Sequence, residues 1–322
     1  MTPKTLLILA ALGLPLLPLA HGAGETPAVK KILFFSKSSG FEHDAIKLRM
    51  KDGREGYAFP VLREIGGKNN IDFTFSKDGS LFTPEYLSQF DAYFFYTTGD
   101  LTQEKSDPRG DGLPPMTAAG KTALLAAVAG GKAFIGTHSA TDTFHSFGRE
   151  DHVPERFLDD GDRADPYIRM LGGEFIRHGA QQSSHLVVAD AGFPGIGAVP
   201  ADYAPMEEWY SLKDFAPDLH VLLVQDTAGM KGAEYARAPY PSTWIHRYGK
   251  GRVFYTSMGH REDIWTSPVF QAVLTGGLNW ALGRVDADLT PNLARVAPEA
   301  NVLPKYVAPP AKAPAPKADK LN

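Results

Sequence analysis

Short apolar runs alternate with segments able to form helices through the first half of the chain. The run from Ile32 to Phe35 contains no polar residue, which is typical of a strand buried on both faces of a parallel sheet. The regular alternation predicts βαβ units joined by right-handed crossovers. We therefore expect an α/β fold with a parallel sheet flanked by helices, whose first four strands lie at residues 31–36, 71–75, 92–96 and 132–137.

Two helical segments are expected between these strands. The second spans residues 117–129, where Thr117 is a suitable N-cap and Gly130-Gly131 ends the helix. The first lies within residues 45–65, where it must break or restart because glycine and proline interrupt helices. The interrupting residues are Gly53, Gly56 and Pro60.

The second half of the chain is richer in strands. Two strands flank residues 248–252, in which Gly249 and Gly251 favour a hairpin. Beyond the hairpin, Ser267 and Pro268 begin a helix that ends at Gly283. We expect these elements to form a strand-rich insertion on the parallel sheet. The expected strands are residues 185–189, 207–212, 220–225, 242–247 and 253–257.

The two ends of the chain differ in composition from the region between them. Lys4, an apolar run from Leu6 to Leu19 and small residues near position 22 indicate a signal peptide over residues 1–22. The run is shorter than the roughly 20 residues of a transmembrane helix, so a cleaved signal is favoured over an uncleaved membrane anchor. We expect an exported protein, periplasmic or secreted, with no transmembrane span after cleavage. Residues 29–284 are expected to form one globular unit. The Pro/Ala/Lys-rich residues 285–322 are expected to be a tail without regular helix or sheet.

Composition excludes several kinds of site and partner. The chain of 322 residues has no cysteine, which rules out thiolate catalysis, cysteine-ligated metals and iron–sulfur clusters. A formal net charge of −4 provides no basic surface for nucleic acid. A small molecule is therefore the expected partner, and a homo-oligomer is left open.

Polar residues follow the predicted parallel strands at their carboxyl ends, where open α/β sheets bind their ligands. Loops at residues 36–43, 97–100 and 136–145 are rich in such residues and should converge if their strands are neighbours. His138 is the strongest candidate, because small residues around it permit a tight strand-to-helix turn like a nucleophile elbow. The alternative is a histidine that only hydrogen-bonds neighbouring loops. Ser139 is read as a turn or capping residue before it is read as a nucleophile.

Other histidines lie in suggestive positions. His178, His246 and His260 follow or occupy predicted strands or motifs, and imidazole can transfer protons near neutral pH or bind a metal. No H-E-x-x-H motif is present. A metal site built from His43, His138, His178 and an acid remains one interpretation, and structural histidines in the core or on the surface are the other.

An acidic and aromatic cluster at residues 207–210 suits a sugar. A carboxylate can bind hydroxyl groups or transfer protons, and an aromatic ring can stack on a pyranose. Because side chains alternate along a strand, Glu207 and Glu208 should face opposite sides. The alternative is an ordinary strand with Trp209 in the core.

Taken in order, these motifs resemble those of the ThuA-like (trehalose utilisation) family over residues 30–284. The matching blocks are Gly136 to Ala140, Leu171 to Phe175 with His178, Glu208 to Tyr210, Pro241 to His260, and Gly276 to Ala281. The resemblance implies a flavodoxin-like sheet of the class I glutamine amidotransferase type. In amidotransferases a cysteine stands at the elbow, whereas this chain has His138 there, so glutamine hydrolysis is excluded.

The resemblance further implies carbohydrate metabolism, associated with disaccharides and their 3-keto derivatives. It favours an enzyme that acts on a glycoside or keto-glycoside by acid–base chemistry, with His138, Glu208, His178 and His260 as catalytic residues. Sugar contacts are expected from six residues: Phe41, His43, Asp100, Ser139, Trp209 and His246. The long acidic loop at residues 149–165 and the exported location depart from the family pattern, so the sugar and its linkage stay open.

Two other interpretations remain. The same crevice could belong to a non-catalytic carbohydrate-binding protein that uses Phe41, Trp209 and Trp265. A metal-dependent hydrolase is the third interpretation, so no cofactor is assigned and a divalent metal stays open.

Overall fold

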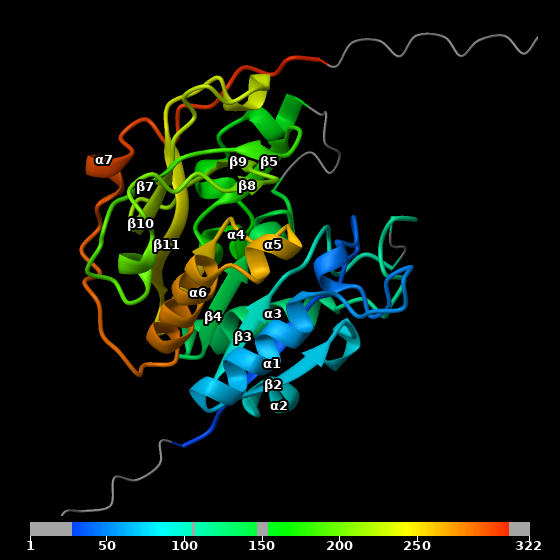
Figure 1. Cartoon of the computed structure of the whole chain (residues 1–322). Helices are drawn as coiled ribbons and strands as arrows, with labels where there is room; N and C mark the ends of the chain where they lie inside the picture. Colours follow the sequence, from blue (N-terminus) through cyan, green and yellow to red (C-terminus); the bar gives the residue numbers. More distant parts are fainter. Residues whose placement is uncertain (1–27, 105–106, 147–153, 309–322) are drawn as a thin grey trace, which may run out of the picture.

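The computed structural model describes residues 28–104, 107–146 and 154–308, and its centre is a sheet with strands in the order β2-β1-β3-β4-β12-β11-β10-β7 (Figure 1). The first five strands in this order, β2, β1, β3, β4 and β12, run parallel to one another. The other three, β11, β10 and β7, extend the sheet with antiparallel pairing. Their bounds are β1 Lys30–Phe35, β2 Ile71–Ser76, β3 Ala92–Phe95, β4 Ala133–Thr137, β7 Leu186–Val188, β10 His220–Gln225, β11 Tyr240–Tyr248 and β12 Gly251–Thr256. The predicted α/β sheet is confirmed, and its antiparallel part is the strand-rich extension.

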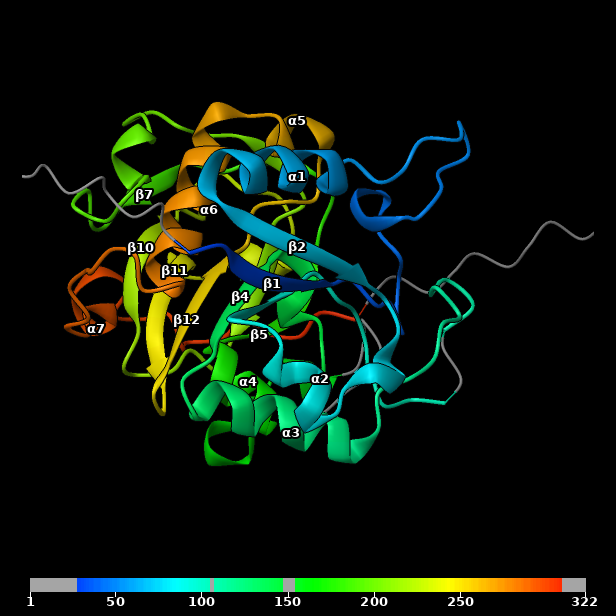
Figure 2. The ribbon, with the colours of Figure 1, turned by 90° about the horizontal axis from the view of Figure 1, so that it is seen from below.

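Helices cover both faces of the sheet (Figure 2). One face carries α1 (Ala58–Asn69), α5 (Glu262–Trp265) and α6 (Pro268–Ala281). The other carries α2 (Pro84–Ser88), α3 (Ala118–Ala129) and α4 (Pro166–Leu171). Side chains of neighbouring strand residues alternate between the two cores: Phe34 packs in the first core and Phe35 in the second. Burial on both faces explains why these strands have continuous apolar sequences.

The expected helices form with some changes at their ends. The first segment is interrupted as predicted: a 3-10 turn at Asp44–Ile46 precedes α1, and Pro60 lies in the first turn of α1, where proline is tolerated. Thr117 caps α3 by accepting a hydrogen bond from the backbone of Gly120. Ser267 occupies the N-cap position of α6 but its side chain makes no capping hydrogen bond, so that expectation is corrected. The remaining 3-10 turns are Gly79–Leu81, His138–Thr141, Pro154–Phe157, Gly161–Arg163, Ile196–Ala198 and Ala233–Tyr235.

The expected strand at residues 207–212 is divided in two. β8 (Met206–Glu207) pairs with β6 (Gln182–Ser183), and β9 (Tyr210–Lys213) pairs with β5 (Glu174–His178). The chain must leave one pairing partner for the other at Glu208-Trp209, so these two residues belong to neither strand. The predicted hairpin is confirmed, because Tyr248 pairs with Gly251 and Gly249 adopts a left-handed φ of 58°.

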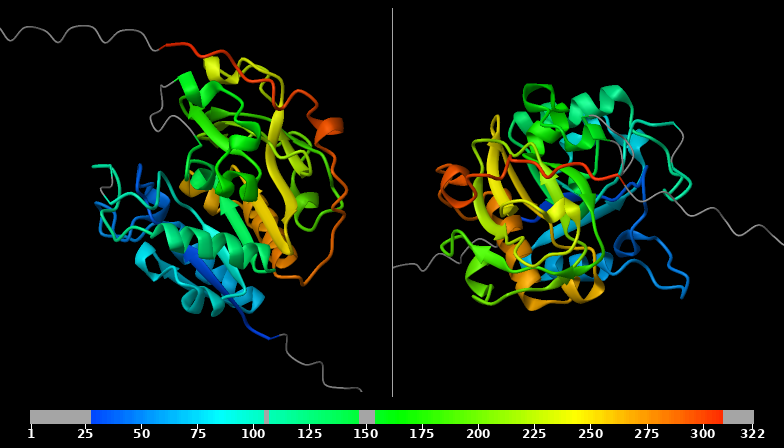
Figure 3. Two further views of the ribbon diagram at one scale, coloured as in Figure 1. Left: turned by 180° about the vertical axis from the view of Figure 1, so that it is seen from behind. Right: turned by 90° about the horizontal axis from the view of Figure 1, so that it is seen from above.

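Residues 286–308 pack against the antiparallel side of the sheet (Figure 3). A one-turn helix, α7 (Leu293–Val296), corrects the expectation of a tail without regular structure. Leu293, Ala297 and Ala300 are buried in the second core, so apolar residues among the prolines hold this segment in place. The predicted signal peptide lies outside the described residues. Across the described ranges, no helix has the length and apolar character needed to cross a membrane.

Candidate functional site

Three parallel strands deliver their following loops to one edge of the sheet. The loop after β1 carries His43, the turn after β4 carries His138, and the segment after β12 carries His260. Parallel bridges beyond the strands join the loop after β3 to its neighbours: Thr98 pairs with Ser38 of the loop after β1, and Gly99 pairs with Thr143 of the loop after β4. The predicted convergence at the carboxyl edge is therefore confirmed.

His138 lies at a strained turn. Its φ is +44°, in the left-handed region that costs a non-glycine residue free energy and is enriched at functional sites. Its carbonyl accepts a hydrogen bond from the Tyr255 hydroxyl at 2.7 Å, and its imidazole Nδ1 lies 3.3 Å from the carbonyl of Ser257. Gly136 lies just before the turn, where a Cβ would come within about 3.1 Å of Leu171, Ala140 and Tyr255. Local packing thus fixes both the backbone and the ring of His138.

Glu208 is the centre of a histidine cluster. Its Oε2 lies 3.1 Å from His260 Nδ1, 3.6 Å from His138 Nε2 and 3.8 Å from His43 Nε2. Its Oε1 lies 3.4 Å from His178 Nδ1. His260 Nδ1 and His138 Nε2 are 3.3 Å apart. Four imidazoles from separate parts of the chain therefore surround one carboxylate.

The environment separates the protonation states of these groups. Burial lowers the pKa of His138 to about 3 and also lowers the pKa of His43. Burial alone would lower the pKa of His260 too, but the hydrogen bond and charge of Glu208 outweigh it and raise that pKa. Burial opposes ionisation of Glu208, yet hydrogen bonds from the histidines hold its pKa well below the ordinary value. At neutral pH the cluster therefore contains a Glu208 carboxylate and neutral rings at positions 43 and 138.

Glu207 holds the backbone at His260, one of the residues of the cluster. Its side chain is buried, and its carboxylate accepts hydrogen bonds from the backbone N–H groups of His260 at 3.1 Å and Gly259 at 3.3 Å. Burial raises the pKa of Glu207 to about 7. Glu207 and Glu208 thus face different surroundings, although β8 ends at Glu207 and regular strand alternation does not extend to Glu208. Of the two, only the Glu208 carboxylate contacts the imidazole rings of the cluster.

A cavity of about 680 Å³ opens above the cluster. Glu208, His43 and His178 reach its wall, and Phe41 lies beside it with 47% of its surface exposed. On another part of the wall, His145 contacts Asp142 at 2.5 Å and Glu174 at 3.1 Å. The remaining lining is mostly polar, including Asp100, Gln103, Arg109, Lys121, Arg156 and Asp165. A cavity of this size and polarity suits a polar small molecule.

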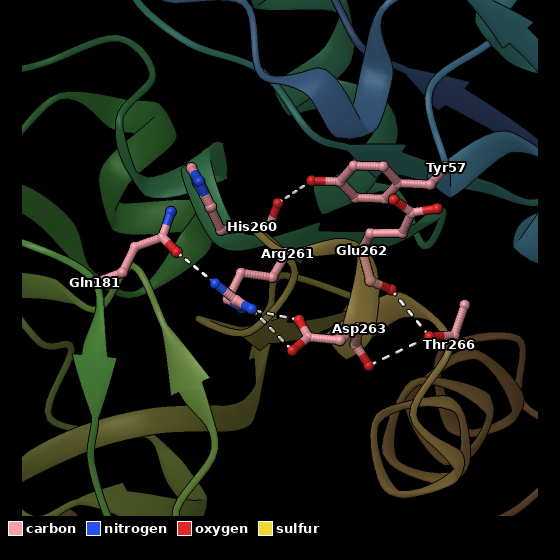
Figure 4. A pocket seen from close by; sticks show the side chains of 7 residues that line it. All are labelled: Tyr57, Gln181, His260, Arg261, Glu262, Asp263 and Thr266. Atoms are coloured by element: carbon pink, nitrogen blue, oxygen red, sulfur yellow. Dashed lines mark hydrogen bonds and ion pairs between the residues drawn. The ribbon is translucent and has the colours of Figure 1, made fainter. Parts of the chain in front are cut away.

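His260 also lines a second hollow, of about 560 Å³ (Figure 4). There the Tyr57 hydroxyl donates a hydrogen bond to the His260 carbonyl. Arg261 donates to Gln181 at 2.7 Å and pairs with Asp263, so it ties the segment after β12 to the β5–β6 region. These contacts restrain the backbone that positions His260.

A model of the trehalose utilisation family, ThuA, matches residues 31–281. The chain belongs to the ThuA family. Two solved structures share this fold. A ThuA-like protein from Bacteroides uniformis has 18% identity and a TM-score of 0.54, covering 81% of this chain and 95% of its own. One from Parabacteroides merdae has 19% identity and a TM-score of 0.52, covering 86% and 97%. A search of curated proteins finds no match.

Membership of ThuA supports a sugar-related role, and the structure shows how the predicted site residues of this ThuA chain are distributed. The predicted catalytic residues His138, Glu208, His178 and His260 lie together. Of the predicted sugar-contacting residues, Phe41, His43 and Asp100 line the cavity.

Three other predicted contact residues are not brought to the cavity wall. Trp209 is fully buried in the first core because its side chain points away from that of Glu208. His246 packs beneath α4, where its Nε2 lies 2.8 Å from the Met170 carbonyl. Ser139 is fully buried within the turn after β4. Trp265, considered for a binding protein, is also buried, and its indole N–H donates to the Gly259 carbonyl at 2.6 Å.

Sequence reasoning missed several participants. Glu174 was seen only as part of a motif, yet its buried carboxylate binds His145 and the Ser146 hydroxyl. Glu207 is not among the predicted site residues, although its carboxylate accepts hydrogen bonds from the backbone at Gly259 and His260. The side chain of Tyr210 packs against His138, with ring centroids 4.3 Å apart. A signal for Glu174 and Tyr210 was available in the motif blocks that contain them, but their orientation requires the β5–β9 pairing.

Proposed function

We propose that this chain is a carbohydrate-utilising enzyme that acts on a glycoside or 3-keto-glycoside by proton transfer beside the carbonyl group. The observation that carries the proposal is the cluster around Glu208, where four histidines meet one carboxylate at the base of a polar cavity. Groups with separated pKa values in one site are characteristic of acid–base catalysis. Membership of the ThuA family supports a sugar as the substrate.

The reaction requires a base for a ring C–H and an acid for the keto oxygen. A base takes the proton from the carbon next to the carbonyl, the C–H electron pair forms a carbon–carbon double bond, and the carbonyl oxygen receives a proton. In the resulting enediol, the former carbonyl carbon gains a proton and the other hydroxyl loses one, which moves the keto group to the neighbouring carbon. Alternatively, the enol hydroxyl loses its proton and the carbonyl re-forms, and the double-bond electrons expel the glycosidic oxygen from the adjacent carbon. That oxygen takes up a proton, and the second sugar is eliminated.

Residue positions support specific roles in this reaction. His178 and Glu208 both reach the cavity wall, so we assign them to proton abstraction. The raised pKa of His260 suits a proton donor to the keto oxygen. Burial keeps the neighbouring His138 ring neutral, and its Nε2 lies 3.3 Å from His260 Nδ1, where it can hold the donor ring in place. Phe41 offers an exposed ring at the cavity wall for the apolar face of a sugar. The sequence of residues 1–22 supports action outside the cytoplasm.

The test is incubation with a panel of disaccharides and their 3-keto forms in D₂O, with products and deuterium content read by mass spectrometry. Abstraction of a C–H proton predicts deuterium in the keto form even where no net product accumulates. Glu208→Gln and His138→Ala should abolish exchange and turnover while the fold is retained. His185→Gln, whose ring contacts the Ala201 carbonyl outside the cavity, is the matched control and should behave as the wild type.

Unchanged exchange in both cluster variants would contradict the proposal. Absence of exchange with every sugar, combined with a rise in melting temperature from one of them, would instead identify a carbohydrate-binding protein. Phe41 is the observation that favours this second function, because an exposed ring can bind a sugar without any chemistry.

A further inference from the structure

The donor atoms around Glu208 have the spacing of a metal coordination sphere. His43, His138, Glu208 and His260 each contribute one ligand atom, and all four atoms lie within 4.8 Å of one another. A tetrahedral site with metal–nitrogen distances of about 2.0–2.1 Å has ligand atoms about 3.3–3.4 Å apart. The separations of 3.1, 3.3, 3.6 and 3.8 Å bracket that value.

The ligand atoms converge more closely than hydrogen bonds to one carboxylate alone require, because the two ring nitrogens of His138 and His260 also face each other at 3.3 Å. His138 directs Nε2 and His260 directs Nδ1 toward the same oxygen of Glu208. Two ring nitrogens 3.3 Å apart can share only one proton. A cation among the four atoms would satisfy all of them at once. His43 is 2% exposed and its Nδ1 has no hydrogen-bond partner. Its Nε2 faces the cluster, where it lies 3.8 Å from Glu208 Oε2 and 3.4 Å from the Tyr210 hydroxyl.

Groups behind the ligands hold them in orientation, as in metal sites generally. His138 Nδ1 lies 3.3 Å from the Ser257 carbonyl. The second oxygen of Glu208 faces His178 at 3.4 Å. Glu207 fixes the backbone at His260 through two N–H groups. Ligands anchored on separate elements, each with support of this kind, form a prearranged site.

A second acidic cluster provides an internal comparison. Asp160, Glu174 and Asp214 also have closely spaced carboxylates, but the Lys213 ammonium lies among them, 2.5 Å from Asp160 and 3.5 Å from Asp214. A lysine therefore supplies the positive charge there. The described ion-pair partners of Glu208 are instead four histidines, whose nitrogens are metal donors when neutral.

We propose that His43, His138, Glu208 and His260 bind one first-row transition dication, such as Zn²⁺ or Mn²⁺. Three imidazole nitrogens and one carboxylate oxygen are ligands that such cations prefer in proteins. The inference goes beyond the proposed function, because metal binding can be measured without turnover. With a cation bound, Glu208 and His260 would act as its ligands and not as the base and the proton donor. The cation would then polarise the keto oxygen of the sugar and His178 would be the base, a role that rests on the proposed function.

The experiment uses tag-free protein purified without chelator, and metal content is measured by inductively coupled plasma mass spectrometry. One equivalent of metal per chain is expected. Chelator-treated protein is then titrated with Zn²⁺ by calorimetry and with Co²⁺ by visible absorption, which reports coordination geometry directly. Glu208→Gln and His260→Gln should weaken binding by more than the roughly 10–100-fold that changes behind the ligands cause.

The controls separate this site from adventitious binding. His185→Gln should bind as the wild type, and Asp160→Asn should also leave the stoichiometry unchanged. Circular dichroism verifies the fold of each variant, and zinc should raise the melting temperature of the wild type but not of the two ligand variants. Absence of stoichiometric metal and of a Co²⁺ spectrum in the wild type would overturn the proposal, as would equal affinity in all variants. Deuterium exchange by a protein that binds no metal would support the proposed function and overturn only the metal site.

Discussion

Asn292 offers a strong test of how the chain beyond residue 285 is held. Its side chain occupies the place of a neighbouring strand on β10: Oδ1 accepts from the Val221 N–H at 2.7 Å, and Nδ2 donates to the Val221 carbonyl at 3.0 Å. Both bonds are buried. In Asn292→Ala, one buried donor and one buried acceptor lose their partner, and each such group costs about 1–3 kcal/mol.

We expect Asn292→Ala to lower the free energy of unfolding by about 2–4 kcal/mol, since some loss is recovered by water entering at the edge of the sheet. For a domain of this size that corresponds to a fall in melting temperature of roughly 4–12 °C. The assay is urea unfolding followed by circular dichroism, in which the midpoint should fall while the m-value stays constant. Asn292→Asp keeps the acceptor but not the donor, so its free energy of unfolding should lie between those of the wild type and Asn292→Ala.

Asn301 is the matched control. It makes the same pair of bonds with Phe215, at 3.0 and 3.1 Å, but both are only partly buried. Asn301→Ala should therefore cost less than Asn292→Ala. A change of less than about 0.5 kcal/mol in Asn292→Ala, the range of ordinary surface substitutions, would refute the reasoning and show that the two bonds of Asn292 contribute little to stability.

Three further outcomes are expected. Gly276→Ala should destabilise the protein by at least about 1–3 kcal/mol in thermal unfolding, because the added Cβ would lie 1.8 Å from the Pro194 carbonyl oxygen. Gly67→Ala in α1 is the contrasting case: the added Cβ would have nothing within 4 Å, so this change should stabilise the protein by about 0.5–1 kcal/mol. Burial and the nearby arginine charge would lower the pKa of His145, but the hydrogen bonds that its ring donates to Asp142 and Glu174 outweigh them and raise that pKa. Its stabilising contribution is thus full below its ordinary pKa of 6.5 and is lost as pH rises through the raised value. The wild type should therefore exceed His145→Gln in free energy of unfolding by less as the pH rises above 6.5. A difference that grows with pH would contradict this. Phe41→Ala should raise KM for a sugar substrate with little change in kcat or melting temperature, because the ring is half exposed at the cavity wall; an equal loss in kcat would argue against a binding role.

The sequence revealed most of the parallel sheet because its strands are buried on both faces. Continuous apolar runs such as Ile32 to Phe35 have no other simple interpretation at that length. The small sheets could not be predicted in the same way. β8 and β6 have two residues each, too few for any periodicity, and their pairing depends on contacts distant in sequence. The break at Glu208-Trp209 follows from that pairing.

The candidate site was predictable where a residue directly follows a buried strand. His138 and His43 could be assigned to the ligand edge because parallel strands share it. Side-chain direction was the limiting unknown elsewhere. Trp209 is adjacent to Glu208 in sequence, yet one side chain is in the core and the other in the cluster. His246 occupies β11, whose facing helix α4 was not predicted, so its contact with Met170 could not be foreseen.

The turn after β4 shows how one backbone feature can serve different chemistry. The left-handed residue projects its side chain sharply into the site, which in an amidotransferase-like fold presents a nucleophile. Here the projecting side chain is imidazole, and its Nε2 faces Glu208 instead of the open cavity. A ring held with its Nδ1 against the Ser257 carbonyl and its Nε2 toward Glu208 fits the proposed proton transfer or cation binding better than attack on a substrate. The strain at His138 is therefore best understood as the cost of placing one nitrogen at the centre of the cluster.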